Sequence, residues 1–128
     1  MTYKIGDKEF GVHLGMLFQE AWLKLIEDLA EKMLLSGKKD GVSLSETETA
    51  AFLIYHGNIN YSKLNDINPA FTSIGDVYKT METEPNSPVY DEISKQYNDS
   101  QTAKTVLELT QKLQDAAKKA QPAKKKTQ

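Results

Sequence analysis

The sequence predicts an α+β protein that is mainly helical, with an N-terminal β-hairpin packed on a small helical bundle. Over the first 14 residues, apolar and polar residues alternate as they do in half-buried strands. Later segments carry apolar residues three and four positions apart, which is typical of amphipathic helices. The chain has 128 residues and no cysteine, so it is long enough to bury a core without disulfides.

Residues 3–14 are expected to form the hairpin. Tyr3 and Ile5 lie on one face of the first strand, and residues 6–8 (Gly-Asp-Lys) supply turn chemistry. The second strand should present an apolar face made of Phe10, Val12 and Leu14.

The clearest helix is predicted over residues 16–35, with Gly37 as its C-terminal cap and a turn after it. A second helix begins near Ser45, because Ser45 and Glu48 have the spacing of a capping box. Its apolar residues surround the helix, which predicts burial by the domain or by a partner. We expect this helix to end at Gly57-Asn58.

The asparagine-rich segment 58–71 is predicted to be a loop. A short helix should follow, capped by Thr72 or Ser73 and broken at residues 84–88. Ser87 as cap and Pro88 as first helical residue then open the next helix.

Three regions result: a hairpin and helical domain over residues 1–100, an extended C-terminal helix over 101–120, and a disordered basic tail over 121–128. The apolar stripe of the last helix is thin, so it is expected to pack weakly alone and to await a partner.

Charge is divided unevenly along the chain. Residues 1–117 contain 18 acidic residues and 11 lysines, a net charge of −7, whereas residues 118–128 contain five lysines and no acid. Arginine, the residue best suited to reading guanine and clamping phosphate, is missing. Nucleic-acid binding is therefore disfavoured, although the lysine tail keeps it as an alternative.

Neither catalysis nor metal binding is predicted. His13 and His56 have no carboxylate or second histidine at ligand spacing, and the motifs of hydrolases, phosphate loops and dinucleotide sites are missing. We expect no cofactor and no catalytic residue. No apolar run reaches the roughly 20 residues that a membrane helix needs, and the N-terminus resembles no secretory signal, so a cytoplasmic location is expected.

Four segments between residues 3 and 82 occur in a distinctive order. They are Tyr3-x-Ile5-Gly6-Asp7-Lys8-Glu9-Phe10, Leu14-Gly15 before a long helix, Phe52-Leu53-Ile54-Tyr55-His56-Gly57, and Asn68-Pro69-Ala70-Phe71-Thr72 before the helix with Val77. In this order they resemble the tail assembly chaperones of tailed bacteriophages. The family's junction often has an aromatic residue or arginine after the glycine, where this chain has Met16-Leu17-Phe18.

The resemblance implies a non-enzymatic protein that binds the tape-measure protein and assists tail-tube subunits as they assemble around it. It also implies self-association, residence in the cytoplasm of an infected or lysogenic bacterial host, and absence from the mature virion. Such proteins often have a longer form made by ribosomal frameshifting, and the lysine run at 124–126 fits a slippery site.

We expect partner contacts on the apolar second helix and on the thinly striped last helix. The alternative function is that of a small nucleic-acid-binding or regulatory protein that acts through the lysine tail. The predicted protein-binding residues are Phe52, Leu53, Tyr55, Val106, Leu109 and Leu113.

Overall fold

The computed structural model describes residues 2–36 and 44–120. At the outer ends of its two longest helices, it describes the backbone but only some of the side chains. These residues form an antiparallel two-stranded hairpin and five helices, so the α+β, mainly helical class is confirmed. The predicted turn after Gly37 and the tail 121–128 lie outside this description. The elements are β1 (Thr2–Ile5), β2 (Lys8–Gly11), α1 (Met16–Ser36), α2 (Glu46–Leu64), α3 (Ile74–Thr83), α4 (Val89–Asn98) and α5 (Gln101–Ala120).

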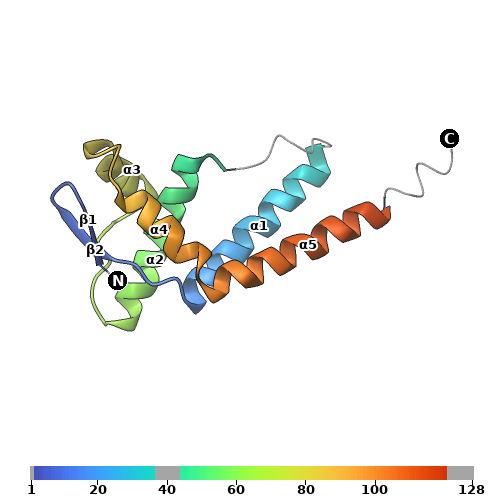
Figure 1. Ribbon diagram of the computed structural model, residues 1–128, viewed down its shortest axis with the longest axis horizontal. Helices are drawn as coiled ribbons and strands as arrows, with labels where there is room; N and C mark the ends of the chain where they lie inside the picture. Colours follow the sequence, from blue (N-terminus) through green and yellow to red (C-terminus); the bar gives the residue numbers. More distant parts are fainter. Residues whose placement is uncertain (1, 37–43, 121–128) are drawn as a thin grey trace.

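The hairpin, α2, α3 and α4 form a body, and α1 and α5 extend from it in the same direction (Figure 1). The hairpin contacts α2, α3 and α4, so it closes one side of the helical core. Each large apolar side chain in that core contributes about 1.5–3 kcal/mol by leaving water. The largest fully buried apolar side chains are Phe18, Ile5, Leu53, Ile54, Ile93, Val12 and Val77.

The hairpin turns at Gly6, whose φ of 58° lies in the left-handed region that glycine adopts without strain. Tyr3 pairs with Phe10 across the strands, and their ring centroids lie 6.2 Å apart. The second strand is shorter than predicted, because it ends at Gly11. Val12 and Leu14 are buried in the linker that leads to α1 instead of in a strand.

The capping box predicted for α2 is confirmed. The Ser45 hydroxyl accepts the backbone N–H of Glu48, and the Glu48 carboxylate accepts that of Ser45. The predicted end of this helix at Gly57-Asn58 is wrong, and so is the loop predicted over residues 58–64. The helix continues to Leu64, because its glycine and asparagines are used in tertiary contacts.

The β2–α1 linker is bound along the middle of α2. The backbone N–H of His13 donates to the Gly57 carbonyl oxygen at 3.0 Å. A Cβ on Gly57 would lie 2.6 Å from Cγ1 of Val12, so only glycine permits this approach. The buried Asn58 amide donates to the Gly11 carbonyl at 2.8 Å, and its oxygen accepts the N–H of Ala70 at 2.8 Å.

Asn60 determines where α1 begins. Its side-chain oxygen accepts the backbone N–H groups of Gly15 and Phe18, each at 3.1 Å. The first N–H groups of a helix have no partner within the helix, and here a side chain from α2 provides one. The start of α1 is thus capped by a residue more than 40 positions away in the chain.

The later helices begin close to their predicted starts. Ser73 caps α3 by accepting the N–H of Asp76 at 3.2 Å, as one of the two predicted alternatives. Pro88 is the N-cap of α4 instead of its first residue, a shift of one position. The Ser87 hydroxyl still supports the start of α4, because it accepts the N–H of Val89 at 3.2 Å.

We predict that Asn60→Ala lowers the free energy of unfolding by about 1–3 kcal/mol, because two backbone donors lose their acceptor in a mostly buried setting. Urea unfolding should show a lower midpoint with an unchanged slope. The matched control is Asn98→Ala, at an exposed position, with an expected change within about 0.5 kcal/mol. Equal midpoints for the two variants would contradict the capping role.

Candidate protein-binding surface

An aromatic cluster joins the inner half of α1 to α2 and α4. The Trp22 ring lies 5.9 Å from that of Phe18, 5.0 Å from that of Phe52 and 5.5 Å from that of Tyr97, measured between centroids. Offset and edge-to-face pairs of this kind contribute about 0.5–1.5 kcal/mol beyond burial. The cluster therefore holds the first turns of α1 firmly against the body.

Trp22 and Tyr97 carry the polar groups of this cluster. Burial raises the pKa of the Tyr97 hydroxyl above its ordinary value of 10. The buried Trp22 nitrogen has no hydrogen-bond partner among the described residues. The cluster is therefore held by ring packing and not by a hydrogen bond from the indole.

His56 lies at the edge of the same cluster. Its ring centroid is 4.2 Å from that of Phe52 and 5.0 Å from that of Tyr55. Burial lowers the pKa of His56 below the ordinary 6.5, so the neutral ring is favoured. An uncharged histidine adds to the apolar character of this part of α2.

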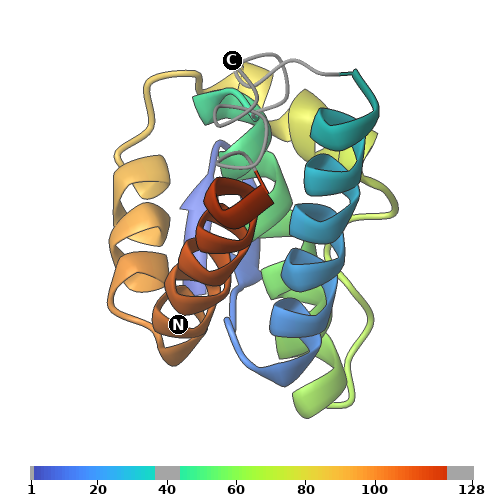
Figure 2. The ribbon, with the colours of Figure 1, turned by 90° about the vertical axis from the view of Figure 1, so that its right-hand side faces the viewer.

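Beyond the cluster, α1 and α5 extend past the body, and we call residues 25–36 and 107–120 the arm (Figure 1). Viewed from the arm's end, α5 lies in front of the body and α1 lies beside it (Figure 2). At the inner end, the Thr102 hydroxyl lies 3.3 Å from the Leu14 carbonyl oxygen and 3.4 Å from Oε1 of Gln19, and it can donate to either. This contact attaches the start of α5 to the start of α1.

The arm presents apolar side chains that the body does not cover. Leu29 of α1 and Leu109 of α5 are half-buried, and neither is among the apolar residues that pack against the core. Leu107 is 60% exposed. Leu25 and Ile26 pack against the core but keep part of their surface exposed. Two long helices with partly exposed leucines are suited to receive another helix.

The structure divides the sequence-predicted contact residues into two groups. Leu53 is 1% exposed and Val106 is 8% exposed, so in this fold neither offers a surface to a partner. Phe52 and Tyr55 on α2 and Leu109 on α5 remain half-buried and accessible. The side chain of Leu113 lies outside the described residues, and its partner contact stays a prediction.

Sequence reasoning missed the contribution of α1 to this surface. Leu25 and Leu29 follow the same apolar spacing as Phe18 and Trp22, yet no residue of α1 was predicted to contact a partner. Periodicity alone cannot separate these residues, because all four lie on one apolar side of the helix. In the structure Phe18 and Trp22 are buried, whereas Leu25 and Leu29 are half-buried.

The described residues contain no group of three or more acidic or histidine side chains arranged to hold a metal ion. None of the helices in residues 2–36 and 44–120 is both long enough and apolar enough to cross a membrane. Compared with protein-family models, curated proteins and solved structures, the chain shows no match. Functional inference therefore depends on the sequence and on the geometry of the arm.

The lowered pKa of His56 predicts a loss of stability in mild acid. Below pH 6.5 the unfolded chain binds a proton more readily than the folded protein, so the free energy of unfolding falls as the pH decreases. We expect urea unfolding to show lower stability at about pH 5.5 than at about pH 7.5. His56→Gln should reduce this difference, whereas the control His13→Gln, at an exposed position, should preserve it. An unchanged difference in the His56 variant would contradict the prediction.

Proposed function

We propose that this protein is a non-enzymatic tail assembly chaperone of a tailed bacteriophage, and that its arm binds helical segments of the tape-measure protein. The observation that carries the proposal is the pair of long helices that leave the body together, with leucines that do not pack against the core: the half-buried Leu29 on α1, and Leu107 and Leu109 on α5. The resemblance of residues 3–82 to tail assembly chaperones supports the same function from the sequence.

Binding would be hydrophobic and reversible. An amphipathic client helix can place apolar residues, three and four positions apart, against Leu29 on one side and Leu109 on the other. Each apolar side chain that becomes buried contributes up to about 1.5–3 kcal/mol, before the cost of ordering both partners is subtracted. A few such contacts give a complex that can form and dissociate while the tail tube grows.

In this proposal the protein acts in the cytoplasm of an infected or lysogenic host, also meets tail-tube subunits, self-associates, and is absent from the mature virion. A helical chaperone needs neither a metal nor a cofactor, because it changes the solubility of its client and makes or breaks no covalent bond. The half-buried Phe52 and Tyr55 offer further apolar surface on α2.

The alternative, a nucleic-acid-binding or regulatory protein, depends on the five lysines of residues 118–128. The net charge of −7 on the rest of the chain opposes it, because a phosphate backbone requires a positive surface. Removal of residues 118–128 separates the two functions. Nucleic-acid binding that is lost with the tail, and that falls steeply with salt, would support the alternative.

The arm can be tested by co-expression with a tape-measure protein. The combined variant Leu29→Glu and Leu109→Glu should lower the soluble yield of the client at least about threefold, since each charge removes an apolar contact and must itself be desolvated. The protein's thermal midpoint, measured in parallel, shows that the variant remains folded.

A matched control is Ile67→Glu, at a 53% exposed apolar position in the α2–α3 connection. This variant should support the client as well as the unchanged protein does. A client that is equally soluble with the arm variant, or with no chaperone at all, would refute the proposed function.

A further inference from the structure

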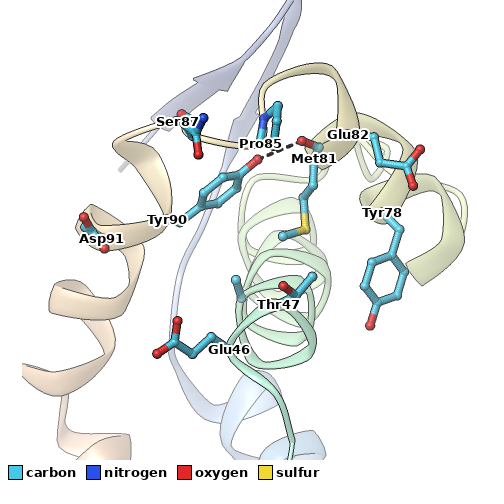
Figure 3. Close-up of a pocket in the computed structure, with 11 residues that line it drawn as sticks. Glu46, Thr47, Tyr78, Met81, Glu82, Pro85, Ser87, Tyr90 and Asp91 are labelled. Carbon is cyan, nitrogen blue, oxygen red and sulfur yellow. Dashed lines mark hydrogen bonds between the residues drawn. The ribbon is translucent and has the colours of Figure 1, made fainter.

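A pocket of about 500 Å³ lies on the body between the start of α2, α3, the α3–α4 connection and the start of α4. Figure 3 shows the Met81 side chain directed toward Thr47 in the first turn of α2, and the Tyr90 ring directed toward Pro85 and the end of α3. The Tyr90 hydroxyl lies 2.8 Å from the Glu84 carbonyl oxygen and 3.2 Å from that of Met81, so it can donate to either. This hydroxyl ties α4 to the end of α3 and keeps the pocket wall in place.

The floor of the pocket is apolar and its rim is acidic. Ala50, Met81 and the rings of Tyr78 and Tyr90 supply the apolar surface. Three exposed carboxylates surround it, and the structure records no ion pair for them within the described residues. No lysine is found among the described side chains that line the pocket. The rim carboxylates are Glu46 on α2, Glu82 on α3 and Asp91 on α4.

This combination fits a lysine side chain. A lysine has an aliphatic stem that packs on apolar and aromatic surfaces, and an ammonium group that requires carboxylates or water. The positive end of the α2 dipole does not oppose such a cation strongly, because Ser45, Glu46 and Glu48 already compensate the first turn. An anion, in contrast, would meet three like charges at the rim.

The chain itself contains a segment of the required chemistry. Residues 121–128 carry three consecutive lysines, Lys124 to Lys126, and no acid, and they follow the last residue of α5. Figure 1 shows α5 leading away from α3 and the start of α2, where the pocket lies. Eight residues span at most about 28 Å when fully extended. A second molecule can present this segment without any reversal of α5.

We propose that the pocket binds the lysine-rich C-terminal segment, residues 121–128, of a second copy of this chain. The apolar floor takes a lysine stem, and Glu46, Glu82 and Asp91 take the ammonium groups. The site is separate from the arm and does not depend on client binding, but it specifies how the self-association in the proposed function would occur. The proposed contact pairs acidic side chains from residues 1–117, which carry a net negative charge, with lysines from the basic segment 118–128.

The test uses the full-length protein in analytical ultracentrifugation, at low salt and at high protein concentration. The pocket variant Glu46→Gln, Glu82→Gln and Asp91→Asn removes the rim charges with little change in shape. The tail variant Lys124→Gln, Lys125→Gln and Lys126→Gln removes the ligand charges. Each alone should weaken self-association at least about tenfold, because exposed ion pairs are weak singly but act together here.

Mixing the two variants distinguishes binding between molecules from binding within one. The tail variant keeps an intact pocket and the pocket variant keeps an intact tail, so the mixture should form a mixed dimer that neither variant forms alone. The matched control Glu9→Gln, Glu20→Gln and Asp66→Asn makes the same charge change at exposed positions outside the pocket. This control should associate as the unchanged protein does.

Added salt should dissociate the unchanged dimer, because exposed charges are screened over roughly 10 Å at 0.1 M ionic strength. The proposal is overturned if the unchanged protein is monomeric, or if the control variant loses association equally. It is also overturned if the mixture fails to associate, which would mean that each tail occupies its own pocket or none. A monomeric protein would also contradict the self-association included in the proposed function. Client binding by the arm is measured separately by co-expression, so a failure of the pocket and a failure of the arm can be told apart.

Discussion

The fold depends on the attachment of the β2–α1 linker to the middle of α2. Gly57 allows the linker to approach, Asn58 binds it at Gly11, and Asn60 caps the helix that follows. Buried polar groups cost free energy unless they are paired, and here the amides pair with backbone groups that would otherwise be unsatisfied. The attachment fixes where the chain passes from the hairpin into α1, and the hairpin and the aromatic cluster then pack on the helical body from that point.

The division into body and arm follows from that attachment. α1 starts at a point set by Asn60, and the aromatic cluster around Trp22 holds its first turns. Along the chain from there, α1 packs on α2 and α5, which are nearly as long as α1 itself. Leu29 of α1 is half-buried but does not pack against the core, and Leu107 of α5 is 60% exposed. The arm extends past the body because α1 and α5 leave it in the same direction.

The two surfaces discussed above differ in physical character. The arm offers apolar area to another helix, and such binding changes little with salt. The pocket between α2, α3 and α4 offers carboxylates around an apolar floor, and binding there weakens as salt is added. A protein with both can hold a client and a second copy of itself through separate surfaces, each with its own response to solution conditions.

Local patterns in the sequence determined the fold class, the helix positions and most helix starts. The capping box of Ser45 and Glu48 and the hydroxyl of Ser73 act within a few residues, so their effect can be predicted without the fold. Gly57, Asn58 and Asn60 are typical of helix ends when only neighbours in the sequence are considered. They lie inside α2 because their partners come from segments 12 to 47 positions away.

The candidate protein-binding surface, too, could be predicted only in part from local sequence patterns. The apolar pattern correctly placed Phe52, Tyr55 and Leu109 on helices, but it could not separate them from Leu53 and Val106, which are buried. Periodicity indicates which face of a helix is apolar, and it does not indicate how far along that face a neighbouring helix extends. Only the tertiary structure decides that, because the covered length of α1 depends on where Asn60 starts it and on how α2 and α5 pack against it.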